Sequence, residues 1–221
     1  MPAFAFSRQP DALSWFGTAA GLPLLEAEHP VIASLVASRP AQPWLWLAPV
    51  AGYADAIAAE LASQGRGLCL HRAGEGLAGP LRCALPLPLA TEAVGTLIVQ
   101  HVHEEGDGEL LEECARLLEP GGRLWLFTLN PWSPYRMRWR KAGLVPGDAR
   151  GWHARLRAVG LHPVDGQVRC LGPVWKPGSI GENTGPWLLR SVQVLEAEKR
   201  VPARIPPSSV RRQWRTGAAA V

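Results

Sequence analysis

The 221-residue sequence contains no apolar run that approaches the ~20 residues a membrane-spanning helix needs. Its first residues, MPAFAFSRQPDALSW, lack the basic segment and longer apolar stretch of a secretory leader. We therefore expect a cytoplasmic protein with no membrane partner. Tyrosine is also rare, with two residues against ten tryptophans. Several tryptophans fall in expected strands and are core candidates: Trp44, Trp46, Trp125 and Trp187.

Cysteine is scarce and is not spaced for metal or disulfide chemistry. The four cysteines form no Cys-x-x-Cys pair and fall in expected strands or a helix: Cys69, Cys83, Cys114 and Cys170. Reduced core thiols are the expected state. The run from His101 to Asp107 superficially resembles the H-x-H-x-D-H zinc motif, but it has Glu105 and Gly106 in place of the Asp and the third His. We expect no metal site.

Acidic residues are absent from the end of the chain. All 19 lie at or before Glu198, whereas six of the 23 basic residues lie in 199–221. Residues 1–198 therefore carry a net charge of −2, and the last 23 residues carry +6. This last segment has no apolar periodicity and is expected to be a disordered basic tail. It offers a contact for an acidic protein or nucleic-acid partner, although a merely solubilising tail explains the same residues.

Residues 94–131 are the most informative stretch of the chain. Thr96–Gln100 is a short apolar, β-branched run, typical of a strand buried on both faces. Apolar residues then recur at helical spacing with charged residues opposite, until Pro120-Gly121-Gly122 ends the helix. Arg123–Leu129 is a second apolar strand. A strand–helix–strand unit predicts parallel strands joined by a right-handed crossover, and hence an α/β fold.

The remaining segments predict further elements around this unit. Helices are expected over 11–20, 26–38 and 53–64, and strands over 44–50, 67–70, 81–84, 165–171 and 187–196. The chain then has about seven strands, and the last two form a hairpin-like pair. We divide it into an N-terminal helical extension (1–43), an α/β domain (44–198) and the basic tail (199–221).

Residues 87–105 (LPLATEAVGTLIVQHVHEE) and 115–131 (ARLLEPGGRLWLFTLNP) resemble the C-terminal half of a class I S-adenosylmethionine-dependent methyltransferase of the type 11 group. The resemblance is good over about residues 40–131. It implies a Rossmann-like α/β fold, with a seven-stranded, mostly parallel sheet flanked by helices and an antiparallel last strand. It also implies S-adenosylmethionine as cofactor, bound at the carboxyl ends of the first strands beside the topological switch point.

The sequence departs from the family pattern at each of three cofactor contacts. The glycine-rich turn after the first strand matches residues 47–53, where only Gly52 is a glycine. His71-Arg72 stands where an acid would hold the ribose, and Cys83 where an Asp would contact the adenine. The positions that the resemblance implies for cofactor binding are Ala48, Val50, Gly52, His71, Cys83 and Ala84.

We interpret the chain as a divergent methyltransferase that acts on an unidentified small or medium acceptor. His101 falls where the family pattern often has His and is the candidate catalytic base, with residues 132–141 as a candidate lid. The departures at the cofactor contacts leave an alternative open, because each buried hydroxyl without a partner costs about 1–3 kcal/mol. In that alternative the chain is a non-catalytic methyltransferase-fold protein (a pseudoenzyme) that serves as scaffold or partner subunit, associated with nucleic acid through its tail.

Overall fold

Strands and helices alternate along most of the chain. The computed structural model describes residues 12–39, 41–63, 65–74, 76–101, 108–164, 168–174 and 186–200. The strands are β1 (Trp44–Ala48), β2 (Gly67–Ala73), β3 (Gly76–Ala78), β4 (Val94–Gln100), β5 (Leu118–Leu129), β6 (Leu161–Pro163), β7 (Arg169–Leu171) and β8 (Val192–Lys199). The α-helices are α1 (Leu22–Ala37), α2 (Ala51–Ala62), α3 (Glu109–Leu117), α4 (Arg136–Lys141) and α5 (Ala149–Ala158), with short 3-10 helices η1 (Ala12–Gly17) and η2 (Trp187–Leu189).

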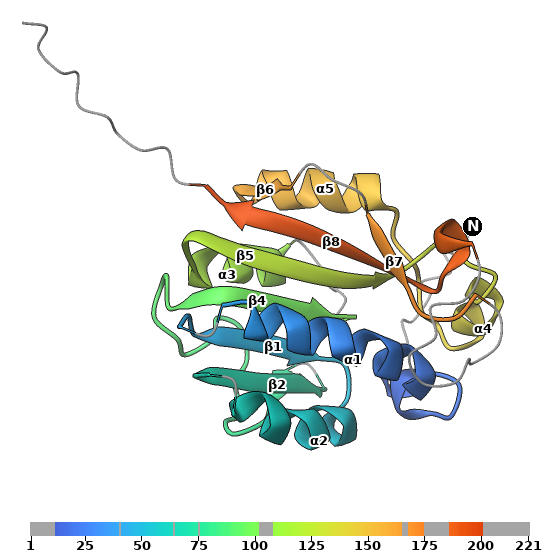
Figure 1. Cartoon of the computed structure of the whole chain (residues 1–221), viewed down its shortest axis with the longest axis horizontal. Coiled ribbons are helices and arrows are strands. Elements are labelled where there is room, and N and C mark those ends of the chain that lie inside the picture. The colour runs from blue at the N-terminus through green and yellow to red at the C-terminus, as the bar shows by residue number, and fades with distance from the viewer. Residues whose placement is uncertain are drawn as a thin grey trace, which may run out of the picture.

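All described strands join one mixed sheet in the order β3-β2-β1-β4-β5-β8-β6, with β7 also paired to β8 (Figure 1). Neighbours from β2 to β5 are parallel, and β8 is antiparallel to β5. β6 pairs with residues 197–199 of β8, and β7 pairs with residues 192–194. These two short strands share one edge of β8, so eight strands occupy seven positions across the sheet. The expected α/β fold with an antiparallel last strand is confirmed.

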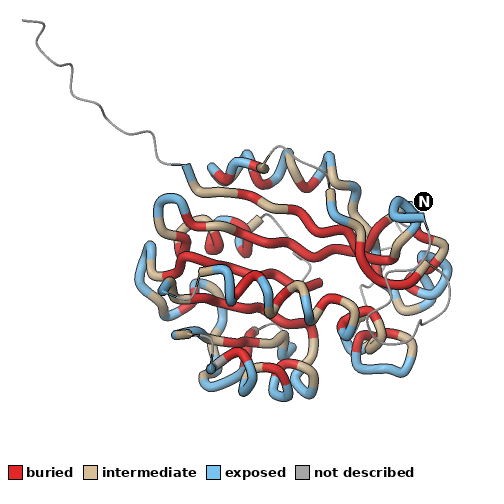
Figure 2. Tube along the Cα trace, viewed as in Figure 1, coloured by how far each residue is buried: buried red, intermediate tan, exposed pale blue. Residues whose placement is uncertain are grey.

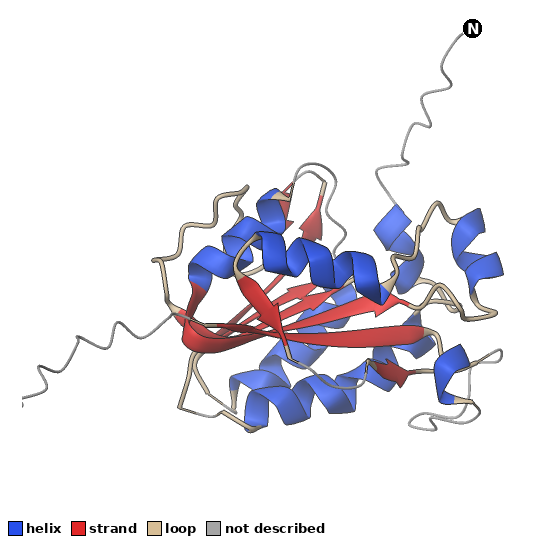
Figure 3. Cartoon of the chain, turned by 90° about the horizontal axis from the view of Figure 1, so that it is seen from above, coloured by secondary structure: helices blue, strands red, loops and turns tan. Residues whose placement is uncertain are grey.

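Helices cover both faces of the sheet, as the view from above shows (Figure 3). Apolar side chains of η1, α1, α2 and α4 pack on one face, and those of α3 and α5 pack on the other. β1 illustrates the division, because Trp44 and Trp46 point to the first face while Leu45 and Leu47 point to the second. The central strands are buried along their length (Figure 2).

The N-terminal helix α1 shares the core of the sheet. Leu24, Leu25 and Ile32 are completely buried in the same cluster as Trp46 of β1. Trp44, Trp46 and Trp125 are buried as expected. The expectation for Trp187 was wrong: this residue lies in η2, outside β8, and half of its surface is exposed.

The connection from β2 to β4 differs most from the sequence-based expectation. The third strand lies at 76–78 and not at 81–84, where Cys83 forms only an isolated bridge with Leu77. β3 is antiparallel to β2, so the chain turns straight back after β2. The described residues 79–93, which lead to β4, contain no helix.

A leucine-rich segment takes the place of a covering helix on the second face of the sheet. Leucines at positions 81, 85, 87 and 89 pack against the cluster that contains Leu45 and Leu70. The intervening Pro86 and Pro88 have no backbone N–H, so this irregular segment leaves fewer donors to satisfy. We call residues 81–89 the leucine segment.

Two further observations concern the class of protein. Among the residues that the structure describes, no helix is both long and apolar enough to cross a membrane. The four cysteines are free thiols, of which Cys69 and Cys114 are buried, whereas Cys83 and Cys170 are partly exposed. Burial, with a smaller contribution from Asp55, raises the pKa of Cys69 to about 12. Cys69 is therefore a neutral core side chain at physiological pH.

Candidate functional site

The candidate site lies at the carboxyl ends of β1 and β4. After β1 the chain enters α2 on the first face of the sheet, and after β4 it continues to α3 on the second face. Because the two connections leave in opposite directions, the gap between β1 and β4 is the topological switch point of the sheet. Open α/β sheets bind their ligands at this point.

The N-terminus of α2 is exposed at this switch point. Val50 is the N-cap residue in extended conformation, and no side chain caps the helix. Ala51 and Gly52 of the first turn are exposed, and a Cβ built on Gly52 would meet no atom within 4 Å. An uncapped first turn presents backbone N–H groups and the positive end of the helix dipole, which favour an anionic group.

The sequence-predicted contacts divide into two sets. Ala48, at the buried end of β1, is the register partner of the half-buried His71 in β2. Together with Val50 and Gly52, these residues lie around one end of β1. Cys83 and Ala84 lie apart from them, because β2 and β3 separate the Leu77–Cys83 bridge from β1. Cys83 is half-buried with a burial-raised pKa, and Ala84 is exposed.

Among the residues that the structure describes, the end of β2 offers no carboxylate to a ribose. The described residues 65–74 and 76–86 contain neither Asp nor Glu, and Glu75 falls outside the described residues. The positions at the strand end are His71, Arg72 and Ala73. His71, half-buried in β2 and paired with Ala48, is the described residue at the position where the resemblance implies the ribose contact.

A buried carboxylate dominates the first face at this end of the sheet. Glu28 of α1 is completely buried, and its Oε2 accepts a hydrogen bond from Gln100 Nε2 at 2.6 Å. Its Oε1 lies 2.7 Å from His101 Nε2. Gln100 Oε1 in turn accepts a hydrogen bond from Trp46 Nε1 at 3.1 Å. This buried polar network (Trp46, Gln100, Glu28 and His101) joins α1 to β1 and to the end of β4.

Sequence reasoning missed Glu28, although a signal was present. The buried residues of α1 recur at helical spacing: Leu24, Leu25, Glu28, Ile32, Leu35 and Val36. An acid within an apolar helical stripe is expected to have a buried partner, because an unpaired buried carboxylate is strongly unfavourable.

His101, the predicted base, is held tightly at the end of β4. Its side chain is completely buried, its backbone has a left-handed φ of 52°, and its ring stacks on Phe16 at 4.4 Å between centroids. A neutral imidazole that donates from Nε2 to Glu28 keeps its lone pair on Nδ1. Nδ1 is buried without a hydrogen-bond partner among the described residues. The neighbouring His103 lies outside the described residues.

Tyr53 of α2 reinforces the contact between the two helices of the first face. Its hydroxyl donates a hydrogen bond to the Leu25 carbonyl of α1 at 2.6 Å, and its ring meets Trp46 edge-on. Burial, followed by the nearby Glu28 carboxylate, raises the pKa of Tyr53 far above its ordinary value. The hydroxyl therefore remains a donor at any physiological pH.

The predicted lid segment 132–141 lies beyond the carboxyl end of β5. Tyr135 and Trp139 are buried in the first-face core, whereas Trp132, Arg136 and Met137 are exposed. α4 is therefore anchored on one side and faces solvent on the other.

Comparison with known proteins bears on the fold. No protein-family model matches the sequence, and a search among curated proteins gave no match. Many solved structures match the fold. A SAM-dependent methyltransferase from Aquifex aeolicus is 12% identical with a TM-score of 0.55, covering 86% of this chain and 98% of that chain. One from Archaeoglobus fulgidus is 13% identical with a TM-score of 0.55, covering 84% and 97%.

A third similar structure contains ligands. The Burkholderia thailandensis 1,6-didemethyltoxoflavin-N1-methyltransferase, with bound 1,6-didemethyltoxoflavin and S-adenosylhomocysteine, is 15% identical with a TM-score of 0.52. The match covers 85% of this chain and 81% of that chain. Together these likenesses show that the chain has the class I methyltransferase fold.

Proposed function

We propose that the protein is an S-adenosylmethionine-dependent methyltransferase that acts on a small or medium acceptor. The observation that carries the proposal is the exposed, uncapped N-terminus of α2 at the switch point of a class I methyltransferase fold. Ala51, Gly52 and the extended Val50 form the approach to that helix end.

The two ends of the cofactor fit these residues unequally. The methionyl carboxylate suits the first turn of α2, where Gly52 leaves open space above the backbone. At the nucleoside end, His71 offers an imidazole nitrogen as acceptor for a ribose hydroxyl. The described residues 65–74 and 76–86 supply no carboxylate for the second hydroxyl. An unmatched hydroxyl costs about 1–3 kcal/mol, so we expect weak binding.

The chain's own residues would act by positioning and by moving one proton. S-adenosylmethionine, when bound, supplies a methyl group on an electrophilic sulfonium. The first turn of α2 and the ends of β1 and β4 orient the reactants for in-line displacement. Nδ1 of His101 accepts the proton that leaves the acceptor, while Glu28 holds Nε2–H and stabilises the imidazolium. Phe16, which stacks on this ring, has to move aside for an acceptor to reach it.

Calorimetric titration with S-adenosylhomocysteine, supported by a thermal-shift assay, tests the proposal. We expect saturable heat and a raised melting temperature for the full chain. Gly52→Glu should abolish both, because its carboxylate opposes the ligand's own at the end of α2. The variant should still fold, since an acid in the first helical turn is favourable. Arg150→Glu, an exposed first-turn position of α5, is the matched control.

A second candidate is a non-catalytic scaffold of the same fold. It is favoured by the enclosure of His101 between Glu28 and Phe16, together with the lack of a carboxylate among the described residues 65–74 and 76–86. This candidate predicts neither heat nor a thermal shift with the nucleoside ligand at any concentration. An acidic protein or nucleic-acid partner would then bind through residues 199–221. Deleting 201–221 should abolish a salt-sensitive mobility shift with a single-stranded oligonucleotide.

A further inference from the structure

Exposed large apolar side chains are confined to two segments of the described chain. They are Trp132, Met137, Val145, Trp187, Leu188 and Leu189. Trp132 is 73% exposed, and Trp187 and Leu188 are more than half exposed. Exposed apolar clusters of this kind mark interaction surfaces, whereas single exposed apolar residues are ordinary.

Asn130 holds the two segments side by side. Its Nδ2 donates hydrogen bonds to the carbonyls of Leu188 and Arg190, both at 2.8 Å. Its Oδ1 accepts a hydrogen bond from the backbone N–H of Trp132 at 3.1 Å. A buried amide thus joins the turn after β5 to η2, although they are some sixty residues apart in the chain. We call the surface formed by Trp132, Trp187, Leu188 and Leu189 the Trp–Leu patch.

The backbone that carries the patch is well supported. Ser191 and Val192, which follow η2, are completely buried, and the Ser191 carbonyl accepts a hydrogen bond from the Asn130 N–H at 2.9 Å. The turns that carry the apolar side chains are therefore anchored to the sheet.

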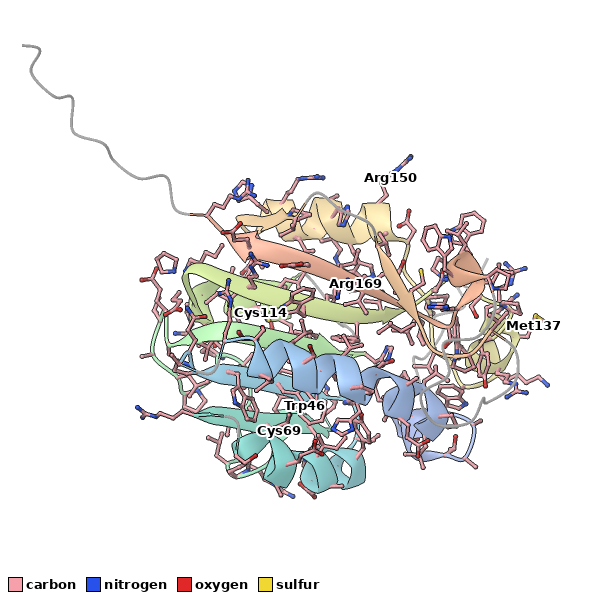
Figure 4. The ribbon with its side chains drawn as sticks, viewed as in Figure 1. Trp46, Cys69, Cys114, Met137, Arg150 and Arg169 are labelled. Atoms are coloured by element: carbon pink, nitrogen blue, oxygen red, sulfur yellow. The ribbon has the colours of Figure 1, made fainter. Side chains whose placement is uncertain are left out.

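The described segments that carry the patch hold basic residues and no acidic ones. The described segments 130–147, 168–174 and 186–195 contain no Asp or Glu. Their cations are Arg136, Arg138, Arg140, Lys141, Arg169 and Arg190. On α4 the exposed residues Arg136, Arg140 and Lys141 flank Met137, and the helix buries Trp139. Figure 4 shows Met137 at this end of the molecule, well away from Arg150 on α5.

We propose that the Trp–Leu patch and α4 bind the surface of an anionic phospholipid membrane. Indole and leucine side chains suit the boundary between headgroups and acyl chains, and arginine and lysine beside them suit lipid phosphates. This is peripheral binding and needs no spanning helix, so it departs from the sequence-based expectation that the protein has no membrane partner. It is independent of the proposed methyl transfer.

The aliphatic side chains favour a membrane over nucleic acid as the occupant. Arginines and tryptophans serve either ligand, because they pair with phosphates and stack on bases. Leu188, Leu189 and Met137 have no such use on a polynucleotide, whereas each gains from transfer out of water at a lipid surface.

Co-sedimentation of the full chain with vesicles tests the proposal. The protein should pellet with phosphatidylcholine vesicles that contain phosphatidylglycerol, and much less with phosphatidylcholine alone. Neutralising one cation, as in Arg136→Gln or Arg140→Gln, should weaken partitioning about fivefold. The double variant Trp187→Ser/Leu188→Ser should weaken it by about tenfold or more while the melting temperature stays unchanged, since both side chains are exposed.

Arg150→Gln is the matched control, because it removes an exposed cation from α5 and should leave partitioning unchanged. The proposal is overturned if anionic vesicles bind no protein, or if the control weakens partitioning as much as Arg136→Gln does. It is also overturned if the patch variants lose binding to a single-stranded oligonucleotide and keep binding to vesicles. Patch-dependent dimers in sedimentation velocity would likewise assign the surface to a second copy of the chain.

Discussion

The single side chain that most constrains the candidate site is Glu28. Its two carboxylate oxygens are shared between Gln100 and His101, and all three side chains are buried. A carboxylate in this position needs both partners, because burying it without them is costly. The hydrogen bond between Glu28 and His101 also fixes the tautomer of His101 on which the proposed proton transfer depends.

Removing Glu28 should therefore destabilise the protein strongly. Glu28→Ala leaves Gln100 and His101 without their acceptor, and we expect the free energy of unfolding to fall by about 3 kcal/mol. Urea denaturation followed by circular dichroism measures the change. Glu26→Ala, two residues away and exposed on the same helix, should change it by less than about 0.5 kcal/mol. Equal effects of the two substitutions would contradict the account.

The thiol of Cys69 should be unreactive in the folded protein. With a pKa of about 12 and a buried position in β2, it forms almost no thiolate at neutral pH. Alkylation by iodoacetamide at neutral pH, followed by peptide mass spectrometry, should leave Cys69 unmodified until denaturant is added. Rapid labelling of the native chain at this position would show that the first-face core is open there.

Residue-level prediction from the sequence had limits that follow from chain geometry. The position of His101 at the end of β4 was predictable, because the strand and the family pattern both mark it. Its pairing with Glu28 was not, since the two lie 73 residues apart and only the packing of α1 on the sheet brings them together. Trp187 was misjudged because its flanking apolar run resembles a strand, whereas β8 begins only at Val192.

Among the elements, the leucine segment depends on one ion pair. Glu113 of α3 accepts a hydrogen bond from the Leu87 N–H at 2.7 Å and one from Arg116 Nη2 at 2.7 Å. Arg116 also donates to the carbonyls of Leu87 and Leu89. The Glu113–Arg116 pair thus fastens an irregular segment to a helix on the same face of the sheet.

The contribution of this pair should vanish in acid. The hydrogen bond from Arg116, supported by that from Leu87, holds the pKa of Glu113 below its ordinary value. A lowered folded-state pKa gives stability that is fully present above the unfolded-state pKa and is lost as pH falls through the folded value. At neutral pH, Glu113→Gln should lower the free energy of unfolding by about 1–3 kcal/mol.

The difference in free energy of unfolding between Glu113→Gln and the native chain should shrink toward zero once Glu113 is protonated in both the folded and the unfolded state. Denaturant titrations at a series of pH values measure it. Glu112→Gln, an exposed neighbour on α3, is the control and should show no such convergence. A Glu113→Gln deficit that stays constant down to strongly acidic pH would contradict the assignment.

The sequence predicted helices and strands best where a regular apolar pattern extended over many residues. β4, α3 and the apolar part of β5 were expected from their patterns, and the structure confirms them. α3 ends earlier than expected, at Leu117, and Pro120-Gly121-Gly122 lies within β5. β3 and β6 are three residues each, too short for a pattern to stand out, and only pairing with β2 or β8 defines them. The leucine segment was unpredictable as a cover, because alternating leucine and proline has no regular structure of its own.

For the whole molecule, the sharing of one core by α1 and the sheet predicts cooperative behaviour. The first-face cluster contains residues of α1, α2, β1, β4, β5 and β8 together. We expect a single unfolding transition by calorimetry, with equal calorimetric and van't Hoff enthalpies. A chain whose residues 1–43 melted separately would give two transitions. The division into an extension, a domain and a tail stays a prediction.

Hydrogen exchange should rank the strands by their depth in the sheet. β4 and β5 are flanked by paired strands and buried between helices, so their amides should exchange last. β3, a three-residue edge strand, should exchange first. Mass spectrometry of peptides from the two regions after timed labelling measures this order, and faster exchange in β4 than in β3 would contradict it.

The leucine segment has a practical consequence for anyone handling this protein. Once Glu113 is protonated, the leucine segment loses the ion pair that holds it to α3. It can then detach from the second face of the sheet over β1 and β2. Apolar side chains that were buried then become exposed to solvent, and molecules of the protein aggregate through them. The added positive charge in acid opposes aggregation, but the exposed apolar side chains promote it. Turbidity and the fluorescence of a hydrophobic dye should therefore both rise as the pH falls.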